Sequence, residues 1–206
     1  MTLYKLRQTK MWGDYGTILT GGLAKRDEQS GLLHLERVGP FAPPIMLGYG
    51  PTGRISLVTQ AFREKLVAAN FGGLDFKPTI KKHIVYLRWE KWDRQQRYPF
   101  EDPPGGEPEN YITEAEHSEK ASSEMGEIWE LTVPVLATCR VARKERYRLS
   151  LYQPQTRWYL TRPEENHGGL FRPPGNSHHL FIDETRRAWF EREAEGWVEF
   201  EDVVVI

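Results

Sequence analysis

Two short apolar runs, each followed by an amphipathic stretch, stand out along the chain. Ile55–Val58 and Leu180–Ile182 are rich in β-branched and aromatic residues, which is typical of buried strands. After each run, apolar residues return at the spacing of one helix face, as far as Asn70 in the first stretch and Glu195 in the second. The pattern therefore predicts a strand followed by a helix at both places.

Start and stop signals frame both expected helices. Thr59 and Asp183 stand directly after the apolar runs, and their side-chain oxygens can accept hydrogen bonds from the free amides of a first helical turn. Gly72 and Gly196 suit the left-handed residue that ends a helix. The alternating segments that follow are Leu74/Phe76 and Val198/Phe200. Each copy therefore reads as strand, capped helix and strand.

A similar motif precedes each copy. Gly39–Pro44 reads Gly-Pro-Phe-Ala-Pro-Pro, and Gly169–Pro174, 130 positions later, reads Gly-Leu-Phe-Arg-Pro-Pro. The helix signals are 124 positions apart, so a gap of six residues aligns the copies. Chance similarity is the alternative, but matched blocks in the same order favour an internal duplication. We expect one domain over residues 1–206, with a first unit at about 39–92 and a second at about 151–206, because about 40 residues alone bury too small a core.

Most of the remaining pattern is strand-like. The further strands that we expect lie at Leu3–Leu6, Ile18/Leu19, Ile84–Trp89, Glu127–Val135 and Val141–Leu151. Residues 98–109 hold four prolines and two glycines, too many for the interior of an element, so we place the acidic connection between the two units at about 98–126. The fold class that follows is α+β, with two related strand–helix–strand units and additional antiparallel strands in one domain.

The composition excludes several classes of protein. The chain carries 28 basic and 29 acidic residues, a formal net charge of −1, which favours a folded chain over a disordered one. A single cysteine, Cys139, excludes an intrachain disulfide framework and a zinc site of several thiolates. No apolar run is long enough for a membrane span, and no signal-peptide pattern follows Met1, so we expect a soluble cytoplasmic protein.

Charge is unevenly distributed along the chain. From Glu101 to Glu130, ten acidic residues face one base, Lys120, which gives a local net charge of −9. The simplest interpretation is a solvated face, and divalent-cation binding is a further alternative. The functional interpretation is a docking surface that attracts a basic partner over a long range.

One segment of this acidic block also carries apolar side chains. Carboxylates supply long-range attraction, while Tyr111 and Ile112 can supply buried contact area. The preceding Pro-Pro-Gly-Gly turn would present the segment away from the core as a loop. The partner-binding residues that we predict are Glu107, Glu109, Tyr111, Ile112, Glu114, Glu116 and Glu119. The alternative is that Tyr111 anchors the loop inward and the glutamates are only solvated.

Catalytic patterns are weak. The six histidines are scattered, and none has the spacing of a metal-ligand motif. Cys139 lacks the local signature of a thiol nucleophile. We therefore predict no catalytic residue, no metal and no cofactor, and a non-catalytic binding protein. The alternative is a hydrolase or transferase whose site is assembled from scattered His and Glu residues.

A second alternative is a weak nucleic-acid-binding module. The run from Arg140 to Arg148 is strongly basic and lies near several aromatic residues, as in proteins that hold single strands. The whole-chain pI of about 6.6 argues against this interpretation, because nucleic-acid-binding domains are usually basic.

A resemblance adds to this picture. Gly39–Pro44, the strand Ile55–Thr59, the helix Ala61–Ala69 and the segment Gly72–Pro78 resemble immunity proteins from bacterial polymorphic-toxin systems, and Phe171–Phe200 is similar to their C-terminal unit. Together these segments cover about a third of the chain. The resemblance implies a cytoplasmic, non-enzymatic protein that binds and blocks a cognate toxin domain. Some related groups carry paired Cys-x-x-Cys elements; this chain has none, so no metal ligands follow.

Overall fold

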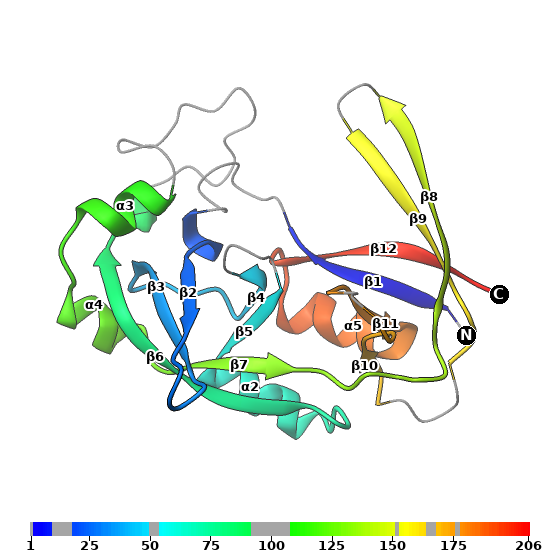
Figure 1. The fold of residues 1–206 in the computed structure, drawn as a ribbon, viewed down its shortest axis with the longest axis horizontal. Helices are drawn as coiled ribbons and strands as arrows, with labels where there is room; N and C mark the ends of the chain where they lie inside the picture. The colour runs from blue at the N-terminus through cyan, green and yellow to red at the C-terminus, as the bar shows by residue number, and fades with distance from the viewer. Residues whose placement is uncertain are drawn as a thin grey trace. The chain divides into compact units, whose positions relative to one another are not determined.

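The computed structural model of the chain describes residues 2–9, 18–49, 54–91, 108–150, 153–163, 168–175 and 178–206. Within them, helices accompany two six-stranded sheets, which confirms the α+β class (Figure 1). The contacts group the chain into two compact units, described separately below. Unit 1 is Met1–Arg7, Val67–Asp75 and Val133–Ile206, and unit 2 is Gln8–Leu66 and Phe76–Thr132. That the two units form a single domain stays a prediction.

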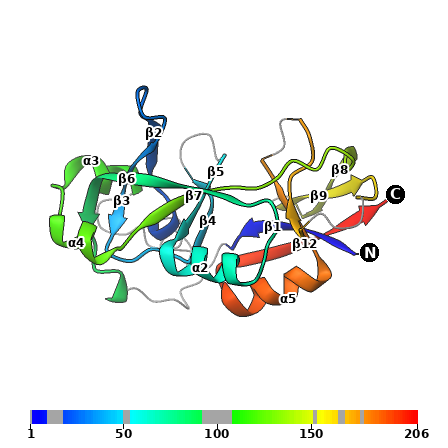
Figure 2. The same cartoon turned by 90° about the horizontal axis from the view of Figure 1, so that it is seen from below.

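The sheet of unit 1 has the order β10-β11-β1-β12-β9-β8. Its strands are β1 (Leu3–Gln8), β8 (Val141–Ser150), β9 (Gln153–Leu160), β10 (Leu170–Phe171), β11 (Leu180–Asp183) and β12 (Val198–Val205). Helix α5 (Glu184–Glu193) connects β11 to β12 and packs against both, and Figure 2 shows it beside β12. The strand–helix–strand order expected for this part of the chain is therefore present.

Local signals explain where α5 begins and how it is held. The carboxylate of Asp183 accepts a hydrogen bond from the amide of Arg186 at 2.8 Å, which confirms the expected N-cap. Gly196 has a φ of 76°, the left-handed conformation expected of it after the helix. On its inner side α5 buries Phe190, which meets the ring of Phe71 edge-on at 5.7 Å. Caps and one apolar stripe thus fix this helix on its sheet.

The other face of the same sheet carries a second apolar layer. Its buried members are Leu3, Cys139, Trp158, Leu160, Phe171, Phe181 and Val203. These residues come from five of the six strands and from the segment before β8, because alternate positions of each strand point to one face. Large apolar side chains are therefore buried on both faces of this sheet, so neither face is wholly exposed to solvent.

The sheet of unit 2 has the order β2-β3-β6-β7-β5-β4. Its strands are β2 (Leu23–Arg26), β3 (Leu33–Gly39), β4 (Ile45–Tyr49), β5 (Ile55–Thr59), β6 (Asp75–Tyr86) and β7 (Ile128–Thr132). The helices along this stretch are α2 (Gln60–Ala68), the 3₁₀ turn η1 (Trp89–Lys91), α3 (Pro108–Glu114) and α4 (Glu119–Glu124).

Helix α2 begins as expected and ends differently. The hydroxyl of Thr59 accepts from the amide of Phe62 at 3.3 Å, and Phe62 and Leu66 bury one face of the helix. The left-handed positions after the helix are Asn70, with a φ of 55°, and Gly73, with a φ of 72°. We expected Gly72 in this role. Asn tolerates the left-handed conformation better than most residues, so the chain turns earlier than the glycine pair suggests.

Arg37 of β3 is fully buried. Its guanidinium donates to the carbonyl oxygens of Val38 at 3.1 Å and Phe41 at 3.2 Å, and also to that of Leu19. Burial lowers the pKa of this arginine, the direction expected for a cation removed from water. The side chain therefore holds three separate pieces of backbone together through carbonyl acceptors.

The two sheets follow one plan. The order β10-β11-β1-β12-β9-β8 corresponds, strand by strand, to β4-β5-β7-β6-β3-β2. Directions agree as well: β11 with β1 and β5 with β7 are antiparallel, whereas β12 with β9 and β6 with β3 are parallel. The strand before the helix, the strand after it and the hairpin at the far edge thus have counterparts in both units.

The registers fix the spacing of this correspondence. Leu3 lies opposite Asp183, and Ile128 lies opposite Thr59, so the residues at positions 3 and 128 are equivalent and 125 positions apart. The amide of Asp183 bonds to the carbonyl of Gly169, and the amide of Thr59 bonds to that of Pro44, again 125 positions apart. Matching the motif Gly39–Pro44 with Gly169–Pro174 at 130 positions is therefore wrong. The shared letters Gly, Phe and Pro occupy different places in the two sheets.

The strands β1 and β7 are exchanged relative to chain order. β1 precedes β2 in the sequence but lies in the sheet of β8 to β12, and β7 precedes β8 but lies in the sheet of β2 to β6. Each takes the third position, between the strand before the helix and the strand after it. Each sheet is therefore completed by a strand that is distant in sequence from its neighbours.

Several other expectations change. Residues 18–20 are helical rather than a strand at Ile18/Leu19. The strand expected at Ile84–Trp89 is the end of the longer β6, and Trp89 lies in η1. The connection expected at about 98–126 contains α3 and α4, which belong to unit 2.

Candidate partner-binding surface

The segment expected to dock a partner is helical over much of its length. α3 begins at Pro108, a residue favoured at the first helical position because an N–H there would have no helical partner. α4 follows Ser118, whose hydroxyl accepts from the amide of Ala121 at 3.2 Å. We expected a loop here. The Pro-Pro-Gly-Gly turn that indicated one lies before α3, in residues that include Glu107 and are outside the described part of the chain.

The apolar side chains of this segment face inward. Ile112 is only 2% exposed and forms a cluster with Ile18 and Val38, and Tyr111 packs partly buried against the same cluster. The predicted role of Ile112 as partner-contact area is therefore not available to it, because its side chain is already in the core. Tyr111 follows the inward alternative. Both residues attach α3 to β3, which it packs against.

The glutamates face outward. Glu109, Glu114 and Glu116 are exposed, and among the described residues no base forms an ion pair with any of them. The Glu119 side chain is 94% exposed and lies 3.5 Å from Nε2 of His117. We call Glu109, Glu114, Glu116 and Glu119 the acidic surface. Its four carboxylates stand on two helices and on the short link between them.

Strand β6 holds the link between α3 and α4 in place. The amide of Ile84 donates to Nδ1 of His117 at 3.0 Å, and Nε2 of His83 lies 3.1 Å from the carbonyl oxygen of Ala115. The amide of Ser118 donates to the carbonyl of Ile84 at 2.7 Å. Because backbone and side-chain bonds fix the link at several points, the carboxylates of Glu114 and Glu116 extend from a supported backbone.

Lys81 supports the end of α4. Its ammonium donates to the carbonyl oxygen of Gly126 at 3.0 Å and also to that of Ser122. A cation near the last carbonyls of a helix is favourable because those oxygens lack helical partners. Burial lowers the pKa of Lys81, with an opposing contribution from Glu127. The lysine is thus committed to the helix end rather than to the exposed carboxylates.

Burial shifts the pKa of two other titratable groups, Cys139 and His179. Burial raises the pKa of Cys139 to about 11, and its thiol lies 3.2 Å from the carbonyl oxygen of Thr161. Burial lowers the pKa of His179 to about 4, with further lowering by Lys5 and Lys144. At neutral pH the first group is therefore a thiol rather than a nucleophilic thiolate, and the second is a neutral imidazole.

The part of the chain that the structure describes contains no group of three His, Cys, Asp or Glu side chains placed to hold a metal ion. The alternative of a hydrolase or transferase site built from scattered His and Glu residues stays a prediction. None of the described helices is both long and apolar enough to cross a membrane.

Sequence reasoning missed the supports of the acidic surface. Ser118 carries a signal that could have been found, since a serine before a polar helical turn is a common N-cap. His117 and Lys81 act through contacts between distant parts of the sequence, so no local pattern indicates them. Comparison with known proteins adds nothing to these observations: no family model, curated protein or solved structure matches the chain.

Proposed function

We propose that this protein is a non-catalytic binding protein whose acidic surface docks a basic protein partner, specifically a cognate toxin domain that it blocks. The observation that carries the proposal is the set of exposed carboxylates at Glu109, Glu114 and Glu116, which stand on supported backbone and form no ion pair with a base among the described residues. The sequence resemblance to toxin immunity proteins supports the identity of the partner.

Physical chemistry favours a protein partner rich in Lys and Arg. Like charges on neighbouring elements repel one another in the free protein, and a basic partner relieves this repulsion when it binds. Complementary charge also raises the rate of encounter, by factors of about 10 to 10³ at low salt. Because Ile112 is buried, the apolar contact area of such a complex has to come from elsewhere on the surface or from the partner.

Charge reversal tests the proposal. The variant is Glu109→Lys, Glu114→Lys and Glu116→Lys together, and the partner tested is the C-terminal toxin domain of a large secreted protein encoded by a neighbouring gene, where the genome holds one. A matched control changes three exposed acids that are not part of the acidic surface, Glu28, Glu90 and Asp202, to lysine, so that both variants have the same net charge. Association rates are measured by biolayer interferometry at low and moderate salt.

We expect the acidic-surface variant to associate at least about tenfold more slowly at low salt, with the difference shrinking as salt screens the charges over a Debye length of about 10 Å at 0.1 M. The control should associate at close to the wild-type rate. Equal rates for wild type and the acidic-surface variant, or equal slowing in both variants, would contradict the proposal.

A further inference from the structure

The hairpin β8–β9 can be compared with its counterpart in the other unit. It occupies the last two positions of its sheet, as β2–β3 does in the sheet of unit 2. In both hairpins the inner strand pairs parallel to the strand that follows the helix. Because the two sheets follow one plan, differences between the hairpins show what each has acquired separately.

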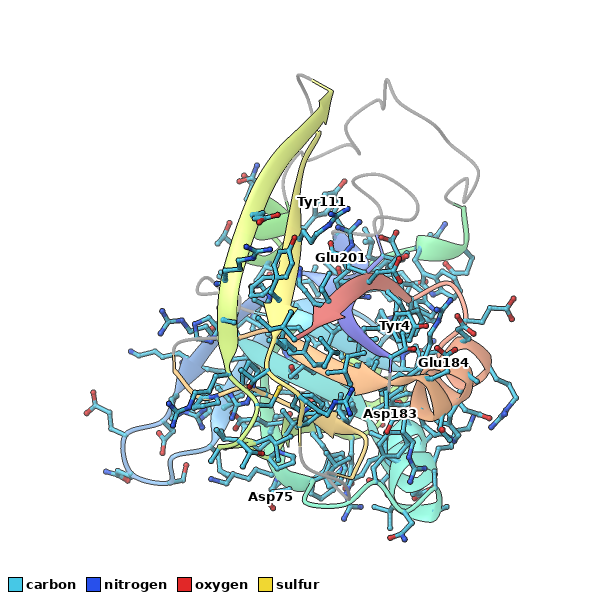
Figure 3. The ribbon with its side chains drawn as sticks, turned by 90° about the vertical axis from the view of Figure 1, so that its right-hand side faces the viewer. Tyr4, Asp75, Tyr111, Asp183, Glu184 and Glu201 are labelled. Atoms are coloured by element: carbon cyan, nitrogen blue, oxygen red, sulfur yellow. The ribbon has the colours of Figure 1, made fainter. Side chains whose placement is uncertain are left out.

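The first difference is how much of the hairpin its sheet supports. β3 pairs with β6 along its whole length, from Leu33 to Gly39. Among the described residues, β9 pairs with β12 only from Trp158 to Leu160, whereas β8 pairs with β9 from Val141 to Ser150. Beyond the short pairing with β12, the hairpin continues as a two-stranded ribbon that extends past the sheet (Figures 1 and 3).

The second difference is charge. The strands β8 and β9 hold five basic residues, Arg143, Lys144, Arg146, Arg148 and Arg157, and one acid, Glu145. That acid is already engaged, because its carboxylate accepts from the Tyr159 hydroxyl at 2.8 Å and lies 3.4 Å from the Arg143 guanidinium. In β2–β3, Arg26 pairs with Glu130 at 2.8 Å and Arg37 is buried, which leaves Lys25 exposed. By sequence, β8–β9 therefore carries a net charge of +4 (five bases, one acid), whereas β2–β3 carries +2 (Lys25, Arg26 and Arg37 against Glu36).

The surroundings of Trp158, where the ribbon joins the sheet, add an independent observation. Trp158 is 3% exposed, and within the described part of the chain its indole N–H is buried without a hydrogen-bond partner. The ammonium of Lys144 lies 4.3 Å from the centre of its ring and that of Lys5 lies 5.2 Å away. In unit 2, Arg26 takes the position of Lys144 and Glu130 takes the position of Lys5, and these two residues form an ion pair. Two cations and an unsatisfied donor here replace a neutral pair, and one carboxylate, Glu201 at 2.8 Å from Lys5, compensates in part.

We propose that the β8–β9 ribbon is a surface for the phosphate backbone of double-stranded DNA. A two-stranded ribbon fits the major groove of B-DNA, which is about 12 Å wide. The bases Lys144, Arg146 and Arg148 occupy alternate positions of β8, so they repeat about every 6.6 Å along the strand. Arginines and lysines on such an element neutralise phosphates, which gives affinity without requiring a particular sequence.

Duplex DNA is a better fit than a single strand. Single strands are held by exposed aromatic rings on which bases stack. Trp158 is buried, and the Arg143 guanidinium covers the ring of Tyr159 at 4.0 Å. Neither of these two described aromatic residues therefore offers a free ring face on which a base could stack.

The test measures binding of the full chain to a short fluorescein-labelled duplex by fluorescence anisotropy, over salt from about 50 to 200 mM. The variant is Arg146→Gln with Arg148→Gln, and the matched control is Lys25→Gln with Lys82→Gln, which removes the same charge from exposed positions of unit 2. Thermal unfolding of both variants checks that each folds, and either single substitution replaces the double variant if it does not.

We expect the ribbon variant to bind at least about tenfold more weakly at low salt, and its slope of log K against log salt to fall by about 1.8, since two phosphate contacts contribute about 0.9 each. The control should keep the wild-type slope. Wild-type affinity in the ribbon variant, or an equal loss in the control, would overturn the proposal. Displacement of the duplex by poly-glutamate as efficiently as by unlabelled duplex would overturn it too, because the ribbon would then recognise acidic protein.

Discussion

The guanidinium of Arg187 lies over the ring of Tyr4, 4.3 Å from its centre, and joins the helix of unit 1 to strand β1. Arg63 lies over Trp129 of β7 at 4.2 Å in the same way in unit 2. A phenylalanine of the following strand completes each stack, Phe200 at 5.4 Å and Phe76 at 5.5 Å. The two arginines are 124 positions apart, and Tyr4 and Trp129 are 125 positions apart. One cation–π arrangement therefore occurs twice, at equivalent positions of the two sheets.

The two stacks differ at one polar position. The Tyr4 hydroxyl bonds to the carboxylate of Glu184, at the start of α5 next to its N-cap Asp183 (Figure 3). In unit 2 the residue equivalent to Glu184 is Gln60. Among the described residues, Oε1 of Gln60, Nε of Arg63 and Nε1 of Trp129 are buried without a hydrogen-bond partner. The bond to Glu184 and burial raise the pKa of Tyr4. Unit 1 is therefore the better satisfied of the two at this position.

Substitutions in the exchanged strands should act on the unit that receives the strand. Leu3 is fully buried and Ile128 is 2% exposed, so truncating either to alanine should lower the free energy of unfolding by about 2–5 kcal/mol. Leu3→Ala should raise hydrogen exchange in β9, β11 and β12, and Ile128→Ala should raise it in β3, β5 and β6. Exchange–mass spectrometry distinguishes the two. Faster exchange in β2–β3 after Leu3→Ala, with β11 unchanged, would refute the assigned exchange of strands.

Tyr49 should make stability fall at high pH. Burial raises its pKa from 10.0 to about 12, so the unfolded chain loses this proton first as the pH rises. The contribution of the neutral phenol is complete below pH 10.0 and is lost as the pH rises toward 12, by about 2–3 kcal/mol in total. Urea unfolding of wild type and Tyr49→Phe across this range should show a difference that shrinks with pH. A constant difference would show that Tyr49 titrates normally.

His179 should make stability fall at low pH. Burial first, and then Lys5 and Lys144, lower its pKa from 6.5 to about 4, so the unfolded chain binds this proton first as the pH falls. Its contribution to stability is present above pH 6.5 and is lost as the pH falls toward 4. His179→Gln should flatten the stability profile over this window, as measured by urea unfolding, whereas His34→Gln serves as the control. An unchanged slope in His179→Gln would reject the assignment.

The N-cap of α4, Ser118, should contribute to the stability of the protein. Ser118→Ala removes the acceptor for the Ala121 amide and should cost about 1 kcal/mol. Ser118→Asp keeps an acceptor and adds favourable charge at the helix start, so it should restore stability. Thermal unfolding compares the three proteins. Equal loss in the alanine and aspartate variants would mean that the hydroxyl acts in another way.

Local sequence signals predict the two strand–helix–strand elements. The N-caps Thr59 and Asp183 and the buried faces of the helices follow from neighbouring residues, so sequence reasoning could locate them. The place of β1 could not be found in this way. Leu3–Gln8 reads as an ordinary strand, and its pairing with Leu180–Asp183 depends on contacts between residues almost the whole chain apart. The match between Gly39–Pro44 and Gly169–Pro174 is wrong for the same reason, because strand register is set by pairing and not by similarity of short sequences.

The candidate surface shows the same division. The acidity of Glu109, Glu114, Glu116 and Glu119 is a property of composition and was predicted, but the direction of Ile112 depends on the segment being a helix. Once α3 is known, its inward face follows from helical spacing. The burial of Arg37 had no sequence signal, because a lone charged residue in an alternating strand is more often solvated.

The exchange of β1 and β7 also sets an order of events during synthesis. The ribosome delivers Leu3–Gln8 before its partner strands β11 and β12, which follow all the strands of unit 2. At about 5–20 residues per second, roughly 10–40 s pass before β1 can enter its sheet. During that time the nascent chain carries an apolar strand without its neighbours, while unit 2 can complete its own sheet once β7 has emerged. Maturation of unit 1 therefore waits until β12 has emerged, and translation products truncated before β11 would leave β1 unpaired.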